Sequence, residues 1–279
     1  MKVFHREFFY GRPVSLLALG CVVLLISCRG RGAIHAALTS SADTVPVEAV
    51  TGYDYDTVSA IGAEPERETG ALSPTERRLA EAGLTEIVPD DTAILVHLVY
   101  ATPENFTGKV LYTDLRRAYL LPEAARMLYR ASECLRRERP GLRLLIYDAA
   151  RPMSVQREMW NLVKGTPQYI YVSNPANGGG LHNYGAAVDL TLADGNSAPL
   201  PMGTPFDYFG QEAHIDREDE LVAQGRITQQ ELDNRLLLRK VMRQAGFRPL
   251  RSEWWHFNAM TRAEARERYR AVESPEYGG

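Results

Sequence analysis

The segment Gly178-Gly-Gly-Leu-His182-Asn-Tyr-Gly185-Ala-Ala-Val-Asp189 decides how the folded part of this 279-residue chain is interpreted. It begins as a glycine-rich loop and passes into an apolar run, so we predict a strand over residues 186–192. Side chains alternate between the two faces of a strand, and His182 and Asp189 are seven residues apart, so one regular strand cannot aim both at one site. We therefore expect His182 in the loop and Asp189 on the strand that follows.

A second segment, Glu253-Trp-Trp-His256, adds another carboxylate and another imidazole. Its aromatic residues favour a strand over a helix. Residues three apart face opposite sides of a regular strand, so either Glu253 precedes the strand or a bulge redirects it. Two imidazoles and two carboxylates are the side chains of a catalytic zinc site, which keeps three protein ligands and leaves a fourth position for water.

A third segment, Asp148-x-x-Arg151-Pro152, follows an apolar run over residues 142–147 that is typical of a buried strand. An arginine fixed at the end of a strand can direct its guanidinium at negative charge that develops during a reaction. The same arginine could instead form a structural ion pair with Asp148. The sequence alone leaves both roles open for Arg151.

The remaining patterns mix helices and strands without the regular alternation of a parallel α/β sheet. A proline in the first turn predicts a helix that begins at residue 122 and ends at Pro140-Gly141. Helices are also expected over 154–164 and from the capping box Thr228-Gln-Gln-Glu231 to residue 246, and strands over 94–100 and 253–257. This mixture favours an α+β domain with a mainly antiparallel sheet and flanking helices.

The N-terminal residues are typical of an export signal. Lys2, Arg6 and Arg12 precede an apolar run over residues 14–26, which is too short to span a bilayer comfortably. The run ends in Leu25-Ile-Ser-Cys28, which resembles the bacterial lipobox and predicts cleavage before Cys28 and lipidation of that cysteine. A plain secretory signal or an uncleaved anchor helix is the alternative.

We therefore predict a lipoprotein signal peptide over 1–27, a flexible tether over 28–75 and a folded domain over 76–279. The lipid would hold the protein in the cell envelope, outside the cytoplasm and facing the periplasm. Since Cys21 is removed with the signal and Cys28 is lipidated, only Cys134 stays a free thiol, and no intrachain disulfide can form.

The charge balance argues against a polyanionic partner. The chain has 32 Lys and Arg against 35 Asp and Glu, for a net charge of -3, so it has no broad basic surface for nucleic acid. The charge-rich residues 262–270 are typical of a solvated helix face.

The three segments together resemble the zinc D-alanyl-D-alanine dipeptidases, a family within the zinc DD-peptidases that includes the vancomycin-resistance dipeptidase. The resemblance extends to residues 95–102, 105–108 and 202–209, and the motifs occur in the family's order over most of the domain. It implies the zinc DD-peptidase (Hedgehog/DD-peptidase-like) fold and makes residues 76–279 the catalytic domain.

The resemblance also implies a role for each site residue. One zinc ion would be held by His182, Asp189 and His256, with Glu253 as general base and acid and Arg151 as the transition-state stabiliser. This agrees with the physical requirements, because a carboxylate outside the metal's ligands can move the proton of the attacking water.

Three residues are expected to bind substrate: Asp207, Gly180 and Tyr184. Asp207 would accept the free ammonium group of the substrate, although a turn or helix-cap role is the alternative. Relatives commonly have a serine two residues before the first zinc histidine, where it helps to hold the substrate. Gly180 stands at that position here, which removes a hydroxyl and affects the choice of substrate.

The implied reaction is zinc-dependent hydrolysis of D-alanyl-D-alanine, or a related D-amino-acid dipeptide, to free amino acids in cell-wall peptide turnover. One alternative is a zinc DD-carboxypeptidase that acts on peptidoglycan stem peptides. The other is a non-catalytic cell-envelope lipoprotein that binds zinc or peptide. Asp207 favours the dipeptidase, and the presence of both Glu253 and Arg151 argues against a purely structural zinc.

Overall fold

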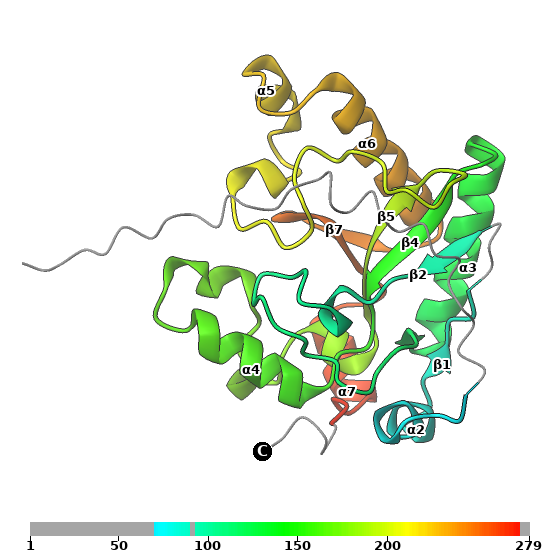
Figure 1. Ribbon diagram of the computed structural model, residues 1–279, viewed down its shortest axis with the longest axis vertical. Coiled ribbons are helices and arrows are strands. Elements are labelled where there is room, and N and C mark those ends of the chain that lie inside the picture. The colour runs from blue at the N-terminus through cyan, green and yellow to red at the C-terminus, as the bar shows by residue number, and fades with distance from the viewer. Residues whose placement is uncertain (1–69, 90–92, 274–279) are drawn as a thin grey trace, which may run out of the picture. The chain divides into compact units, whose positions relative to one another are not determined.

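The computed structural model describes residues 70–89 and 93–273 (Figure 1). The predicted signal peptide, Cys28 and most of the predicted tether lie outside these residues. Helix α2 (Pro74–Glu81) is capped by Ser73, so the boundary predicted at residue 76 lies inside this helix. Among the helices of the described residues, none is long and apolar enough to cross a membrane.

Five strands form the central sheet in the order β2-β4-β5-β7-β6 (Figure 1). Their bounds are β2 (Ile94–Val96), β4 (Arg143–Asp148), β5 (Ala187–Ala193), β6 (Arg248–Leu250) and β7 (Glu253–Asn258). Strand β2 pairs with β4 in parallel, whereas the other neighbours are antiparallel. The α+β class is confirmed, but the sheet is mixed, and the expectation of a mainly antiparallel sheet missed the parallel pair.

Helix α3 (Pro122–Glu138) explains that parallel pair. Two parallel neighbours need a crossover connection, and α3 lies in the chain between β2 and β4. It packs against β4 and against α6 (Gln229–Gln244), which also contacts β5 and β7. The predicted Thr228 capping box is confirmed at the start of α6. The main core therefore lies between these two helices and the sheet, with Leu128, Leu190 and Val241 fully buried in it.

The remaining helices are α4 (Met153–Val163), α5 (Glu218–Ala223) and α7 (Arg262–Arg268). A small separate sheet pairs β1 (Thr85–Glu86) with β3 (Tyr119–Leu120). The strand predicted over 94–100 is too long, because β2 ends at Val96 and Val99–Ala101 form the short 3-10 helix η1. The backbone N–H groups of Leu111 and Tyr112 donate hydrogen bonds to the carbonyl of Tyr100. The apolar residues Val99–Ala101 therefore lie in a turn of the chain and not in a longer strand.

Strand β5 separates the core from the face that carries chemistry. Val188, Leu190 and Leu192 belong to the main core cluster. Because side chains alternate along a strand, Asp189 points to the opposite face of the sheet. A second, smaller cluster on that face includes Leu145 and Ala193.

Candidate metal and catalytic centre

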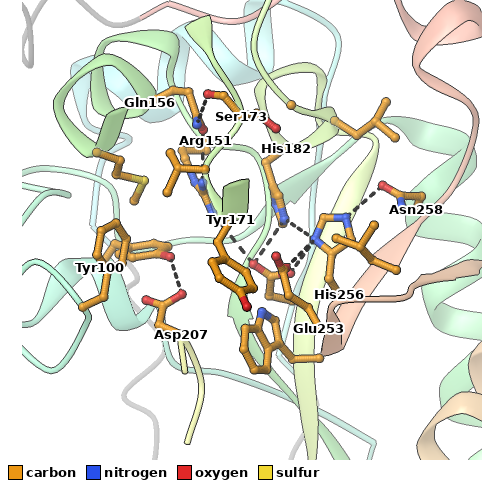
Figure 2. A pocket seen from close by; sticks show the side chains of 18 of the residues that line it. Tyr100, Arg151, Gln156, Tyr171, Ser173, His182, Asp207, Glu253, His256 and Asn258 are labelled. Carbon is orange, nitrogen blue, oxygen red and sulfur yellow. Dashed lines mark hydrogen bonds and ion pairs between the residues drawn. The ribbon is translucent and has the colours of Figure 1, made fainter. Parts of the chain in front are cut away.

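Three buried side chains, His182, Asp189 and His256, form a group that could hold a metal ion. Figure 2 labels the two histidines. One ligand atom from each residue lies within 4.8 Å of the others. Asp189 on β5 is paired directly with His256 on β7. His182 lies in the 3-10 helix η4 (Leu181–Tyr184), which precedes β5, so the loop and strand positions predicted for His182 and Asp189 are confirmed.

Each imidazole makes a hydrogen bond through the ring nitrogen that faces away from this group, and that bond orients the ring toward the centre of the group. His182 Nδ1 lies 2.7 Å from the carbonyl oxygen of Ala149, and His256 Nε2 lies 2.9 Å from Asn258 Oδ1. When these nitrogens donate, His182 Nε2 and His256 Nδ1 keep their lone pairs, 3.1 Å from each other. Such partners fix the tautomer of a metal-binding histidine.

The carboxylate of Asp189 bridges the two imidazoles. Its Oδ2 lies 3.2 Å from His182 Nε2, and its Oδ1 lies 2.9 Å from His256 Nδ1. Burial alone would raise the pKa of Asp189, but the two histidines lower it below its ordinary value. Burial alone would lower the pKa of His182, but Asp189 raises it overall. The site therefore favours an ionised carboxylate beside a cation.

Glu253 begins strand β7, and the register with β6 shifts beside it. Leu250 on β6 pairs with Glu253, whereas the preceding β6 residue, Pro249, pairs with Phe257, so the extra residues lie on β7. Glu253 Oε2 lies 3.9 Å from His256 Nδ1, and burial raises the pKa of Glu253 to about 7. Glu253 therefore lies at the first position of the strand, next to a shift in register, and does not precede the strand. Glu253 is thus a carboxylate with a raised pKa beside the metal-binding group.

Arg151 forms an ion pair with Asp148 and also faces the cavity, so it combines the two arrangements that the sequence left open. Its Nε and Nη2 donate to Asp148 Oδ2 at 3.0 and 2.7 Å, and its Nη1 donates to Gln156 Oε1 at 3.1 Å. The same guanidinium lines the cavity and lies 3.8 Å from Asp189 Oδ2. Burial alone would lower the pKa of Arg151, but Asp148 raises it well above its ordinary value. A fixed positive charge therefore faces the cavity.

Asp207 lines the same cavity from a different side (Figure 2). Tyr100 donates its hydroxyl to Asp207 Oδ1 at 2.9 Å. The other oxygen, Oδ2, is closed off from solvent and has no hydrogen-bond partner among residues 70–89 and 93–273. Asp207 also lies in a turn with a positive φ of 62°, a conformation that aspartate adopts more readily than most residues other than glycine. Its burial raises its pKa to about 7.

The cavity measures about 250 Å³ and contains all of the predicted metal-binding and catalytic residues. It is smaller than the roughly 300–1,000 Å³ of typical pockets for drug-sized ligands, which indicates a small substrate. Gly180 also lines it. Tyr184, which the sequence predicted to bind substrate, does not line the cavity. Its ring is buried in the core, and its hydroxyl donates to the carbonyl of Gly178 at 3.1 Å. Tyr184 is therefore a structural residue.

Several cavity residues were missed in the sequence, among them Ser173, Asn258 and Arg262. Asn258 could have been found, because it lies two residues after His256 and so shares its face of the strand. Ser173 and Arg262 gave no local signal. The prediction of a solvated face over 262–270 overlooked that Arg262, the first residue of α7, is at the edge of the cavity.

Known proteins are similar in sequence to more than half of this chain. The sequence model of one protein family, described as D-ala-D-ala dipeptidase, matches residues 80–275. The chain belongs to this D-ala-D-ala dipeptidase family. A curated relative, the D-alanyl-D-alanine dipeptidase of Escherichia coli (strain K12), is 35% identical over 62% of this chain and 81% of that protein. The D-alanyl-D-alanine dipeptidase of Enterococcus faecium is 32% identical over 57% of this chain and 82% of that protein.

The metal centre suits the zinc that D-ala-D-ala dipeptidases use. Two imidazole nitrogens and one carboxylate oxygen are a donor set of catalytic zinc sites, which hold the ion by three protein ligands. The hydrogen bonds that leave His182 Nε2 and His256 Nδ1 free to coordinate meet the same requirement. The family resemblance and the zinc cofactor predicted from the sequence are both confirmed.

We expect Asn258→Leu to weaken zinc binding, because His256 would lose the partner that fixes its tautomer. Loss of such a partner typically costs about 10- to 100-fold in metal affinity. Competition with a chromophoric chelator measures the change. Asn161→Leu, an exposed position on α4, is the matched control and should bind zinc like the wild type. Equal zinc affinity of both variants would contradict the orienting role of Asn258.

Proposed function

We propose that this chain hydrolyses D-alanyl-D-alanine, or a closely related D-amino-acid dipeptide, to free amino acids with one zinc ion, in cell-wall peptide turnover. The observation that carries the proposal is that one small cavity combines the His182, Asp189 and His256 group with a separate carboxylate, Glu253, and a second, buried carboxylate, Asp207. When bound, zinc supplies a Lewis acid that polarises the scissile carbonyl and acidifies a water molecule.

Glu253 moves the proton in this proposal. Its carboxylate is outside the three-residue metal group but only 3.9 Å from His256 Nδ1, so it can take a proton from the attacking water. It then returns that proton to the leaving amine nitrogen as the peptide bond breaks. A raised pKa near 7 suits a group that must accept and then release a proton at neutral pH.

Arg151 stabilises the oxyanion that forms when water adds to the carbonyl carbon. Its position is set before the reaction, since Asp148 and Gln156 hold it by three hydrogen bonds. A donor that is already in place has little reorganisation cost when charge develops. The ion pair with Asp148 therefore supports the proposed catalytic role.

Asp207 selects substrates with a free N-terminus. Its buried Oδ2 has no partner in the described part of the chain, and a substrate ammonium would supply both a hydrogen bond and a countercharge. A peptide with a blocked N-terminus would leave this carboxylate unpaired. This favours the dipeptidase over the carboxypeptidase alternative.

We also propose that the α+β arrangement is the zinc DD-peptidase (Hedgehog/DD-peptidase-like) fold.

We expect the zinc-loaded protein to release D-alanine from D-alanyl-D-alanine and a chelator to abolish the release. Glu253→Gln should lower kcat about 10²- to 10⁴-fold, because the neutral amide cannot accept a proton. Its zinc content should stay at one ion, because Glu253 is not in the metal group. Release that survives the chelator would contradict the proposal, and zinc binding without turnover in the wild type would support the non-catalytic alternative.

We expect dipeptide binding to the zinc-loaded Glu253→Gln variant to weaken below pH 7. Burial raises the pKa of Asp207 to about 7, against the opposing effects of Tyr100 and Arg151, and Asp189 adds to the increase. The Asp207 carboxyl is therefore charged above pH 7 and neutral below it, so the ammonium loses its countercharge on acidification. Isothermal titration between pH 5.5 and 7.5 should show up to about a tenfold loss of affinity per pH unit.

A further Asp207→Asn change in that variant is the control. It should lower dipeptide affinity at pH 7.5 and remove the pH dependence. An N-acetylated dipeptide, which has no ammonium, should bind weakly and without this dependence. If the N-acetylated peptide binds and is hydrolysed as well as the free dipeptide, the carboxypeptidase alternative replaces the dipeptidase.

We further propose that the protein is exported and held in the cell envelope, facing the periplasm, by lipid on Cys28. The support is the basic N-terminus, the apolar run and the lipobox-like tetrapeptide. Several acyl chains on one residue anchor a protein far more firmly than one. Incorporation of a labelled fatty acid should be lost in Cys28→Ser and kept in Cys21→Ser and Cys134→Ser. Labelling of Cys28→Ser would show that another residue is the anchor.

A further inference from the structure

Arg262 gives one edge of the cavity a positive charge, and Ser173 lies beside it. Arg262 is exposed, lines the cavity and donates from Nη2 to Ser173 Oγ at 3.2 Å. In Figure 2, Ser173 and Asp207 appear at different ends of the cavity, with Arg151 and His182 between them in this view. The proposed mechanism uses neither Arg262 nor Ser173.

Hydrogen bonds fix Ser173 relative to the catalytic arginine. The buried Gln156 donates from Nε2 to the carbonyl of Ser173 at 2.8 Å, and its Oε1 accepts from Arg151 Nη1 at 3.1 Å. Ser173 also occupies the space beside Gly180. A Cβ on Gly180 would lie 2.9 Å from Ser173 Oγ and 3.2 Å from Ser173 Cβ, so a side chain at residue 180 would displace the serine.

The charge of Arg262 is available to a ligand. In the described ranges 70–89 and 93–273, no carboxylate forms an ion pair with Arg262. By contrast, Arg151 is paired with Asp148, and Arg268 on the same helix is paired with Glu123. A guanidinium that already donates to a neutral hydroxyl keeps further N–H groups, which match the two oxygens of a carboxylate.

The two ends of the cavity therefore carry opposite charges. Asp207 offers an anion with an unpartnered buried oxygen, and Arg262 offers a cation beside a hydroxyl. A free dipeptide has an ammonium at one end and a carboxylate at the other. We propose that Arg262 and Ser173 bind the C-terminal carboxylate of the substrate and so determine specificity for a free C-terminus. This inference rests on the proposed function.

The test uses the zinc-loaded full chain with Glu253→Gln, so that ligand binding is measured without turnover. The two probes are D-alanyl-D-alanine and its C-terminal amide, which differ only in the carboxylate. Adding Arg262→Ala should weaken binding of the free acid at least about tenfold, the usual loss for a hydrogen-bonded charged partner, and leave binding of the amide within about twofold. Arg262→Lys should recover part of the affinity for the acid.

Arg266→Ala is the matched control, because it removes an equal charge from the same helix at an exposed position that does not line the cavity. It should change the binding of neither probe. An Arg262→Ala variant that binds the acid unchanged, or an Arg266→Ala variant that loses as much affinity, would overturn the proposal. Circular dichroism melting of each variant shows whether it is folded.

Ser173 gives an independent test that does not alter charge. Ser173→Ala should weaken binding of the acid and spare the amide. Gly180→Ser should weaken it further, because the new side chain displaces Ser173. Combining it with Ser173→Ala removes the Oγ that the new side chain meets at 2.9 Å, and should recover part of the affinity. A double variant no better than Gly180→Ser would contradict the role of Ser173.

These outcomes are separable from the proposed function. If the wild type hydrolyses no dipeptide, the proposed function fails, while the difference between acid and amide binding still reports on Arg262. If the wild type hydrolyses the dipeptide and the Arg262→Ala change leaves the ratio of acid affinity to amide affinity unchanged, only the assignment of Arg262 and Ser173 fails.

Discussion

Three ionisable residues occupy one row across the centre of the sheet, and this row constrains the rest of the site. Strand pairing places Asp148 opposite Asp189, and Asp189 opposite His256. Two buried carboxylates on neighbouring strands repel each other and lose their hydration, so the row is stable only when donors and cations surround it. Arg151 and Tyr112 supply them to the first carboxylate, and the imidazoles supply them to the second, where a bound metal ion would add its charge.

The need to compensate Asp148 also explains why Arg151 is so well placed. Tyr112 donates to Asp148 Oδ1 at 2.6 Å, which leaves Oδ2 to accept both Nε and Nη2 of Arg151. The ion pair that the sequence suggested as an alternative to a catalytic role is the interaction that fixes the guanidinium. A flexible arginine would have to be ordered during the reaction, whereas this one is ordered by folding.

Sequence reasoning predicted the parts of the site that depend on neighbouring residues. The period of two along a strand separated His182 from Asp189, and it required Glu253 either to precede the strand or to lie at a bulge. His182 is in the loop, and Glu253 begins β7 beside a shift in register. It did not predict the parallel pairing of β2 with β4, because packing of α3 between distant segments decides it. Nor could it place Arg262 against Ser173, since that contact depends on where α7 lies after the last strand.

The two ends of the cavity select substrates in different ways. A guanidinium stays charged at every physiological pH, so recognition of a C-terminal carboxylate by Arg262 does not depend on proton concentration. Asp207 behaves differently, because burial raises its pKa to about 7. An N-blocked peptide leaves this carboxyl without a cation at any pH, whereas a free ammonium gains a countercharge only when the carboxyl is ionised. In the proposed function, discrimination against N-blocked peptides therefore strengthens as the pH rises through 7, because only the ionised Asp207 carboxylate attracts a free ammonium.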